Sequence, residues 1–151
     1  MFPKCLILGM AGMFLMQAAA RSQDTPSDSA SMEERFPNLV QLVPPAKGEK
    51  VQESTIYIDS VRYLSEAARP TLVIHGHLPD GCTHIGSAGH EKSKADLALR
   101  LKAWREPDRL CTQALVPFSF LYRALPDEFS LSDYRRVIVN GNSYELQVNP
   151  N

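Results

Sequence analysis

The stretch VIVNGNSYELQV, residues 137–148, decides the fold class of this chain. Val137 and Val139 share one phase before the dipeptide Asn140-Gly141, and apolar and polar residues alternate after it. Such alternation places every second side chain on one face of a strand. Asn-Gly tolerates the positive φ angles that a tight hairpin turn requires. The stretch therefore predicts a β-hairpin.

The same alternation recurs upstream. Residues 71–78 alternate between an apolar face and a face that carries His75 and His77, which predicts a strand with one solvated face. Residues 56–63 change phase, and a β-bulge near Asp59-Ser60 would reconcile the two halves. Both segments are typical of an antiparallel sheet with one face on a core.

Two further segments are less regular. Residues 94–104 alternate, but their strong helix formers leave a helix as the alternative to the strand that we assign. Residues 115–122 are β-rich, and Pro117 argues for an edge or a bulge there. The aromatic residues of this segment share one phase, which predicts a core face. Six or seven short strands separated by turn residues predict an all-β sandwich.

The first twenty residues have the pattern of a secretory signal peptide. Lys4 is their only charge, an apolar run covers residues 5–16, and Ala18 and Ala20 precede the expected cut before Arg21. The run is shorter than the roughly 20 apolar residues of a membrane helix, although a retained anchor is the alternative. We expect an exported protein, periplasmic or secreted, with no stable membrane span after cleavage.

The remainder divides into a tail and a domain. Residues 21–52 are expected to be a disordered or partly docked tether, because they are polar up to about Met32 and carry only a short apolar patch at 36–45. The β-sandwich domain is expected over residues 53–151. A length of 151 residues suits one domain, and the net charge of −1 gives no electrostatic footprint for nucleic acid.

The cysteine count bears on the compartment. Of three cysteines, Cys5 lies in the signal peptide, which leaves Cys82 and Cys111 in the mature chain. Two cysteines in an oxidising compartment suggest one disulfide. If they pair, the closed loop would stabilise the domain by about 3.6 kcal/mol.

Three motifs together resemble a known group of proteins. GHLPDGCT at 76–83, CTQALVPF at 111–118 and VIVNG at 137–141 are similar to G-x-L-P-D-x-C, C-x5-P-F and V-x-V-N-G of small bacterial exported or lipoprotein-borne domains. The resemblance covers about residues 53–148. It implies an immunoglobulin-like antiparallel β-sandwich with Cys82 bonded to Cys111, and no established activity. The chain departs from the group by an additional Gly- and His-bearing loop after Cys82.

The four histidines are the residues that could carry metal chemistry. His75 and His77 are two apart on one predicted strand, so their imidazoles project from one face and could take two positions on Zn²⁺ or Cu²⁺, with His84 and His90 as further ligands. The ordinary interpretation is that all four are exposed or hydrogen-bonded structural residues. We therefore expect no cofactor, and keep a periplasmic metal-binding protein as the alternative.

No motif indicates an enzyme. The chain has no Gly-x-Ser-x-Gly and no Gly-rich phosphate loop, and its two mature cysteines are assigned to a disulfide. We expect a non-enzymatic module that binds or has a structural role at the cell envelope, through a sheet edge or a loop surface. Its partner would be an envelope protein or a polysaccharide, the latter on basic residues such as Arg100, Lys102, Arg105 and Arg109.

Overall fold

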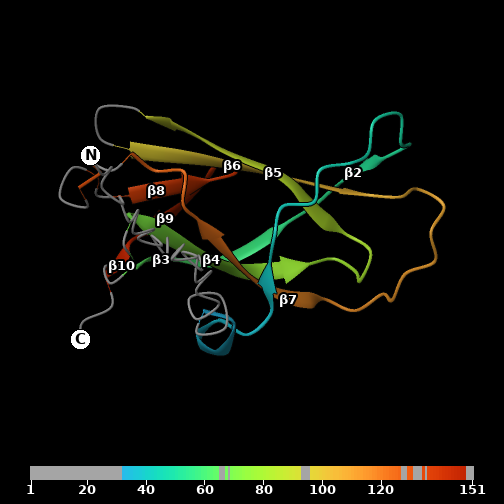
Figure 1. Ribbon diagram of the computed structural model, residues 1–151, viewed down its shortest axis with the longest axis horizontal. Helices are drawn as coiled ribbons and strands as arrows, with labels where there is room; N and C mark the ends of the chain where they lie inside the picture. The colour runs from blue at the N-terminus through green and yellow to red at the C-terminus, as the bar shows by residue number, and fades with distance from the viewer. Residues whose placement is uncertain are drawn as a thin grey trace, which may run out of the picture.

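A computed structural model describes the chain at residues 32–64, 67, 69–92, 96–126, 129–130, 134 and 136–148. Ten β-strands in these residues form two facing sheets, and a single short helical turn precedes them (Figure 1). The all-β sandwich prediction is confirmed. The predicted signal peptide lies outside the described residues. Within them, no helix has the length and apolar character needed to cross a membrane.

The first sheet, sheet A, is built around two antiparallel pairings. Its order is β1 (Leu39–Val40), β7 (Val116–Tyr122), β4 (Thr71–Leu78), β3 (Tyr57–Leu64) and β10 (Gln147–Val148). β4 pairs antiparallel with both β3 and β7. The register of the β3–β4 pair shifts between Ile58 and Ser60, which confirms the predicted bulge.

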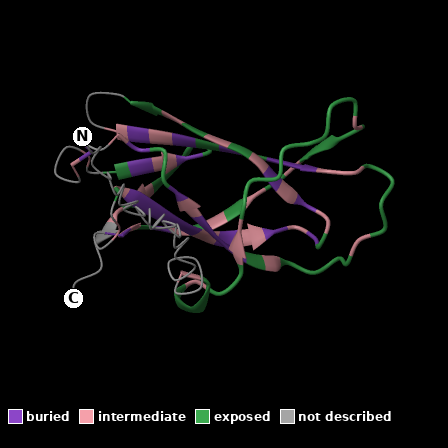
Figure 2. Ribbon diagram, viewed as in Figure 1, coloured by how far each residue is buried: buried purple, intermediate pink, exposed green. Residues whose placement is uncertain are grey.

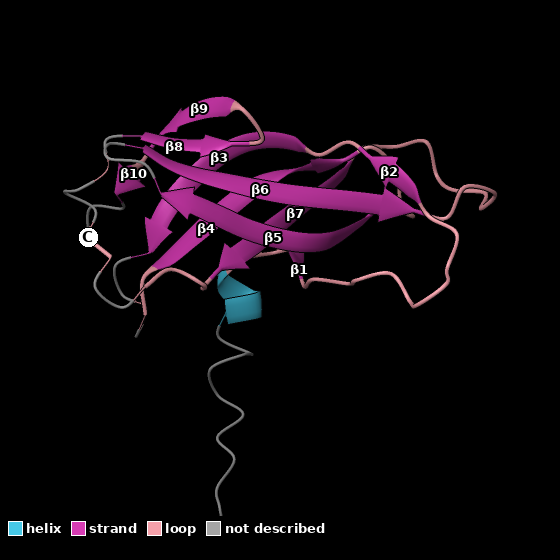
Figure 3. Cartoon of the chain, turned by 90° about the horizontal axis from the view of Figure 1, so that it is seen from above, coloured by secondary structure: helices cyan, strands magenta, loops and turns pink. Residues whose placement is uncertain are grey.

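The second sheet, sheet B, has β6 at its centre. Its strands are β2 (Gln52–Ser54), β5 (His84–Lys92), β6 (Asp96–Arg105), β8 (Arg136–Val139) and β9 (Asn142–Glu145). β5 runs along one side of β6 from Leu97 to Trp104, while β8 and β2 share the other side at opposite ends (Figure 3). The segment 94–104 is therefore a strand where it is described, and the helix alternative is wrong.

The core lies between the sheets, where the purple stretches of the facing strands meet (Figure 2). Leu97, Leu99 and Leu101 of β6 are buried, whereas the intervening Arg100 and Lys102 are exposed, as the alternation predicts. Sheet A contributes a matching row of apolar side chains, including Leu72, Ile74, Phe118, Phe120 and Tyr122. The aromatic residues of β7 thus face the core, which confirms that prediction.

The predicted C-terminal hairpin is confirmed as β8 and β9. Asn140 and Gly141 form its turn with φ angles of 49° and 88°, both in the left-handed region. Only glycine adopts that region without steric cost, and asparagine is one of the few side chains that tolerate it. The turn residues therefore fit the conformation that the sequence indicated.

Both ends of the described chain switch sheets. β1 pairs parallel with β7 of sheet A, and a few residues later the Val43 amide donates to the Ile85 carbonyl of β5 in sheet B, at 2.9 Å. At the opposite lateral edge, the chain leaves β9 of sheet B and β10 pairs parallel with β3 of sheet A. Parallel pairings were not expected from the sequence. Two of them lie in these crossing segments, which partly close the sides of the sandwich, and the third joins β6 to β8 within sheet B.

Candidate functional site

The edge strand β5 carries backbone groups that no other strand satisfies in the described chain. On β6, the Leu99 carbonyl and the Leu101 amide and carbonyl all bond to Asn140, on the β8 side. Successive residues of a strand direct their backbone amides and carbonyls to opposite sides. The amides and carbonyls of Arg100 and Lys102 therefore point toward β5, where these residues pair with Gly89 and Ser87.

It follows that Ala88, His90 and Lys92 direct their amides and carbonyls away from β6. Ile85 has the same orientation, since its carbonyl accepts from Val43. Beyond Ile85, no backbone bond to this outer side of β5 is found in the described residues. We call residues 87–92 of β5 the open edge.

A cavity of about 520 Å³ lies beside the open edge, between the two sheets. Its lining is largely apolar: Ala88 contributes from β5, residues 120–124 from β7 and its continuation, and residues 39–42 from the N-terminal segment. Met32 and Glu33 of the helical turn complete the wall. We call this cavity the edge slot. Its position between β5 and β7 makes it the side of the sandwich that the N-terminal segment leaves partly uncovered.

A hydrogen bond across the sheets sets one end of the edge slot. His90 Nδ1 lies 2.6 Å from the Tyr122 hydroxyl, and the two rings meet edge to face with centroids 5.8 Å apart. Burial raises the pKa of Tyr122, so its hydroxyl stays protonated in the physiological range. The pair ties β5 to β7 at a point where the strands share no backbone bonds.

Trp104 anchors the N-terminal segment to the outer face of sheet B. Its indole Nε1 donates to the Val43 carbonyl at 2.6 Å, and the residue is only 8% exposed. The indole lies so close to Gly86 that a Cβ there would come within 2.6 Å of it. Trp104 therefore caps the fold beneath residues 43–45.

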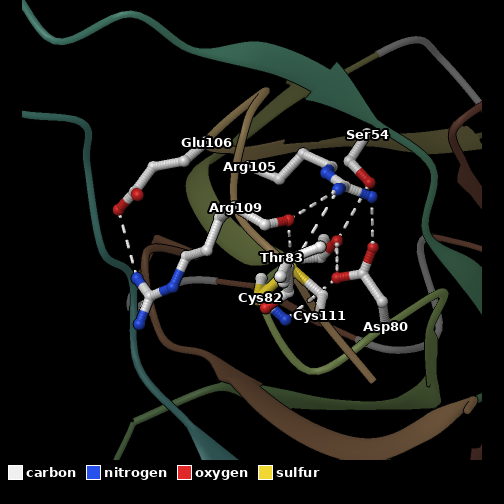
Figure 4. Close-up of a disulfide and its surroundings, with 9 residues drawn as sticks. Ser54, Asp80, Cys82, Thr83, Arg105, Glu106, Arg109 and Cys111 are labelled. Carbon is white, nitrogen blue, oxygen red and sulfur yellow. Dashed lines mark hydrogen bonds and ion pairs between the residues drawn. A yellow bond between two sulfur atoms is a disulfide. The ribbon is translucent and has the colours of Figure 1, made fainter. Parts of the chain in front are cut away.

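The end of the sandwich where β4 leads into β5 is held by the disulfide between Cys82 and Cys111, whose Cα atoms are 5.6 Å apart (Figure 4). The side chain of Asp80 lies beside it and is only 4% exposed. Asp80 accepts hydrogen bonds from the Cys82 amide and the Thr83 hydroxyl at 2.9 Å each, and from Arg105 at 2.7 Å. The disulfide thus rests on a buried polar cluster.

The charge of Asp80 is stabilised inside this cluster. Burial alone would raise its pKa, but the hydrogen bonds from Cys82 and Thr83 and the positive charge of Arg105 outweigh burial, so the pKa lies below its ordinary value. Asp80 comes within 4.8 Å of the two cysteine sulfurs, the arrangement of a metal cluster. The sulfurs are bonded to each other, which makes the group a structural one.

The disulfide also fixes the loop between β6 and β7, residues 106–115. Leu110, next to Cys111, is 99% exposed, and Leu115 is exposed as well. Arg109 forms an ion pair with Glu106 at its base. This loop is the second surface of the domain that could meet a partner.

The four histidines divide between the two sheets. His75 and His77 lie on β4 of sheet A, with side chains opposite to the core-facing Ile74 and Leu78. The other two lie on β5: His84 packs against Trp104, and His90 bonds Tyr122. The sequence predicted an additional loop after Cys82. The structure corrects this, because the segment forms β5, the edge strand of sheet B.

Most of the basic residues considered for a polysaccharide face have acidic partners. Arg105 pairs with Asp80, Arg109 with Glu106 and Arg100 with Glu91. Lys102 is exposed on the outer face of β6. These contacts divide the basic residues among separate ion pairs and do not gather them into one positive surface.

Fold and disulfide together define a small β-sandwich domain. The family model of the ORF11 beta-sandwich domain matches residues 72–149, which is 78 of the 151 residues. The chain belongs to that family. The matched range includes both bonded cysteines, all four histidines and the open edge. A search of curated proteins gives no match. A search of solved structures also gives none.

Proposed function

We propose that this chain is a non-enzymatic, exported binding module that takes up an extended segment of an envelope protein along the open edge of β5. The observation that carries the proposal is the outward backbone of Ala88, His90 and Lys92 beside an apolar slot. An unpaired edge of this kind is a template for another strand. Lys92 at its end is the sort of charged residue that limits uncontrolled pairing.

Strand addition would use both features of the site. The ligand backbone would bond to the outward groups of Ala88 and His90, and alternate ligand side chains would enter the edge slot. Each added hydrogen bond contributes about 0.5–1.5 kcal/mol net, so the apolar side chains in the slot would supply much of the affinity. The ligand is thus expected to be extended, with an apolar residue at every second position.

Two observations support an exported protein. The Cys82–Cys111 disulfide is compatible with an oxidising compartment, where such bonds persist. The first twenty residues have the composition of a signal peptide. A polysaccharide partner is less favoured, because the basic residues that would bind it are paired with carboxylates.

The proposal is tested with a peptide selected from a random display library against the untagged domain. Its affinity is measured by fluorescence polarisation for the wild type and for Ala88→Pro, which removes one outward donor while the Ser87 and Gly89 bonds to β6 remain. Ser87→Ala is the matched control on the same strand, and Leu110→Ser tests the loop surface.

Ala88→Pro is expected to weaken binding at least tenfold, and both other variants to change it less than threefold. Circular dichroism of each variant confirms that the sheet is retained. Equal binding by Ala88→Pro and the wild type would overturn the edge proposal. Loss of binding in Leu110→Ser alone would move the site to the loop.

A further inference from the structure

His75 and His77 differ from the other two histidines in how their rings are held. Both lie on the outer face of β4, two residues apart, and at about 3.4 Å per residue their Cα atoms are about 7 Å apart. Each ring has its Nδ1 bonded to a side chain of a neighbouring strand: Ser119 of β7 for His75, and Asp59 of β3 for His77. The two imidazoles are therefore fixed from opposite sides of β4.

The tautomer of His75 follows from counting protons. The single hydroxyl proton of Ser119 is donated to the Pro37 carbonyl at 3.1 Å. The Ser119 oxygen can then only accept from His75, whose Nδ1 lies 3.0 Å away. Neutral His75 must therefore carry its proton on Nδ1, which leaves the lone pair on Nε2.

His77 reaches the same state by a different contact. Its Nδ1 lies 2.8 Å from the Asp59 carboxylate, which has no proton to give when ionised. His77 is therefore the donor through Nδ1, and in the neutral ring its Nε2 also holds a free lone pair. In the described residues, neither Nε2 has a bonding partner.

We propose that the Nε2 atoms of His75 and His77 form a two-histidine site for a divalent transition-metal ion on the outer face of sheet A. Imidazole nitrogen suits Zn²⁺ and Cu²⁺, and Cu²⁺ is expected to bind more tightly by the Irving–Williams order. Asp59 and Ser119 would act as the outer partners that orient metal-binding histidines and set their tautomers. Water would complete the coordination.

The charges around the pair are compatible with this role. Burial and the nearby Arg62 lower the pKa of His75, while Asp59 acts in the opposite direction. A neutral imidazole is the form that ligates. Arg62 would repel a metal cation, but the negative charge of Asp59 beside the pair offsets its positive charge.

The site is tested by calorimetric titration of the untagged protein with CuSO₄ and with ZnCl₂ in a non-coordinating buffer. The chain contains four histidines, so two double variants cover all of them. His75→Ala/His77→Ala is expected to abolish saturable binding. His84→Ala/His90→Ala is the matched control and is expected to keep the wild-type affinity within about threefold.

A third variant examines the orienting contact. Asp59 is half-exposed, so Asp59→Ala should fold normally and weaken metal binding by about 10–100-fold. Long-range ¹H–¹⁵N correlation spectra of the metal-free protein should show His75 and His77 with the proton on Nδ1. The proposal is wrong if the wild type shows no saturable binding, or if the His84/His90 variant loses it while the His75/His77 variant retains it.

Discussion

Asn140 takes the place of a missing strand in sheet B, and this role can be measured. On the side of β6 that β8 and β2 share, none of the described strands lies beside Leu101. The Asn140 carboxamide fills the position: Oδ1 accepts from the Leu101 amide at 2.9 Å, and Nδ2 donates to the Leu101 carbonyl at 3.1 Å. Its own backbone amide donates to the Leu99 carbonyl at 3.0 Å.

The informative substitution is Asn140→Asp, which keeps the size and turn preference of the side chain but replaces Nδ2 by oxygen. One hydrogen bond is lost, and a carboxylate oxygen then faces the Leu101 carbonyl. A hydrogen bond contributes about 0.5–1.5 kcal/mol to stability, and a buried polar group left without a hydrogen-bond partner costs about 1–3 kcal/mol. Since the site is partly open to solvent, we expect a loss of about 1–2 kcal/mol at pH 7.

The sign of the pH dependence separates this account from a simple charge effect. The protonated carboxyl can again donate to the Leu101 carbonyl, so the fold raises the pKa of the introduced group. The deficit relative to the wild type should therefore shrink as the pH falls through that raised pKa. Titration of Asp80 occurs in both proteins and cancels in the difference.

Urea unfolding at pH 7 and at pH 3.5 measures the effect. Ser143→Asp is the control, because it adds the same charge to the exposed side of the hairpin. A variant as stable as the wild type at pH 7, or a deficit that grows at pH 3.5, would refute the role assigned to Asn140.

Three other substitutions probe the rest of the scaffold. Asp80→Asn breaks a buried ion pair and should lower the free energy of unfolding by about 3 kcal/mol at pH 7, measured with urea. Because the fold lowers the pKa of Asp80, this loss of stability should shrink as the pH falls below about 4. A loss that does not change with pH would contradict the role of the Asp80 charge. Replacing Cys82 and Cys111 by alanine should lower the free energy of unfolding by about 3.6 kcal/mol, and reduction of the wild type should have a similar effect in the same assay. Gly86→Ala should displace the single tryptophan and shift its fluorescence to longer wavelength; an unchanged spectrum would mean that the indole does not need the space above Gly86.

The sequence predicted the parts of the fold that have a local cause. The alternation in 71–78 and in the two arms of the C-terminal hairpin matches β4, β8 and β9. The solvated face predicted for residues 71–78 is only partly correct, because Thr71 and Val73, in the phase of His75 and His77, are buried. The Asn-Gly dipeptide indicated the turn because its backbone preference is intrinsic to those residues. The two cysteines indicated the disulfide by their count alone.

The parts that were missed depend on neighbours distant in the sequence. β5 was taken for a loop because small residues, including Gly86 and Gly89, hide its alternation, and its pairing with β6 imposes the strand. The parallel pairing of Leu39 with Ser119 leaves no pattern in either segment. The bonds from Asn140 to Leu101 span 39 residues, so the local turn preference of Asn140 could not reveal them.

The candidate sites divide in the same way. Period-two spacing was enough to place His75 and His77 on one face of a strand. It could not show that Ser119 and Asp59 fix the two tautomers, since those residues lie on other strands. The open edge could not be predicted from the sequence either, because a strand is an edge strand only when no other strand pairs with one of its sides.

Amide hydrogen exchange along β5 tests the central claim most directly. In the free protein, the amides of Ser87 and Gly89 should be protected by β6, whereas those of Ala88 and His90 should exchange rapidly. Adding the selected peptide should protect Ala88 and His90 and leave Ser87 and Gly89 unchanged. Protection of all four amides in the free protein, or rapid exchange of Ala88 and His90 when the peptide is bound, would contradict strand addition at this edge.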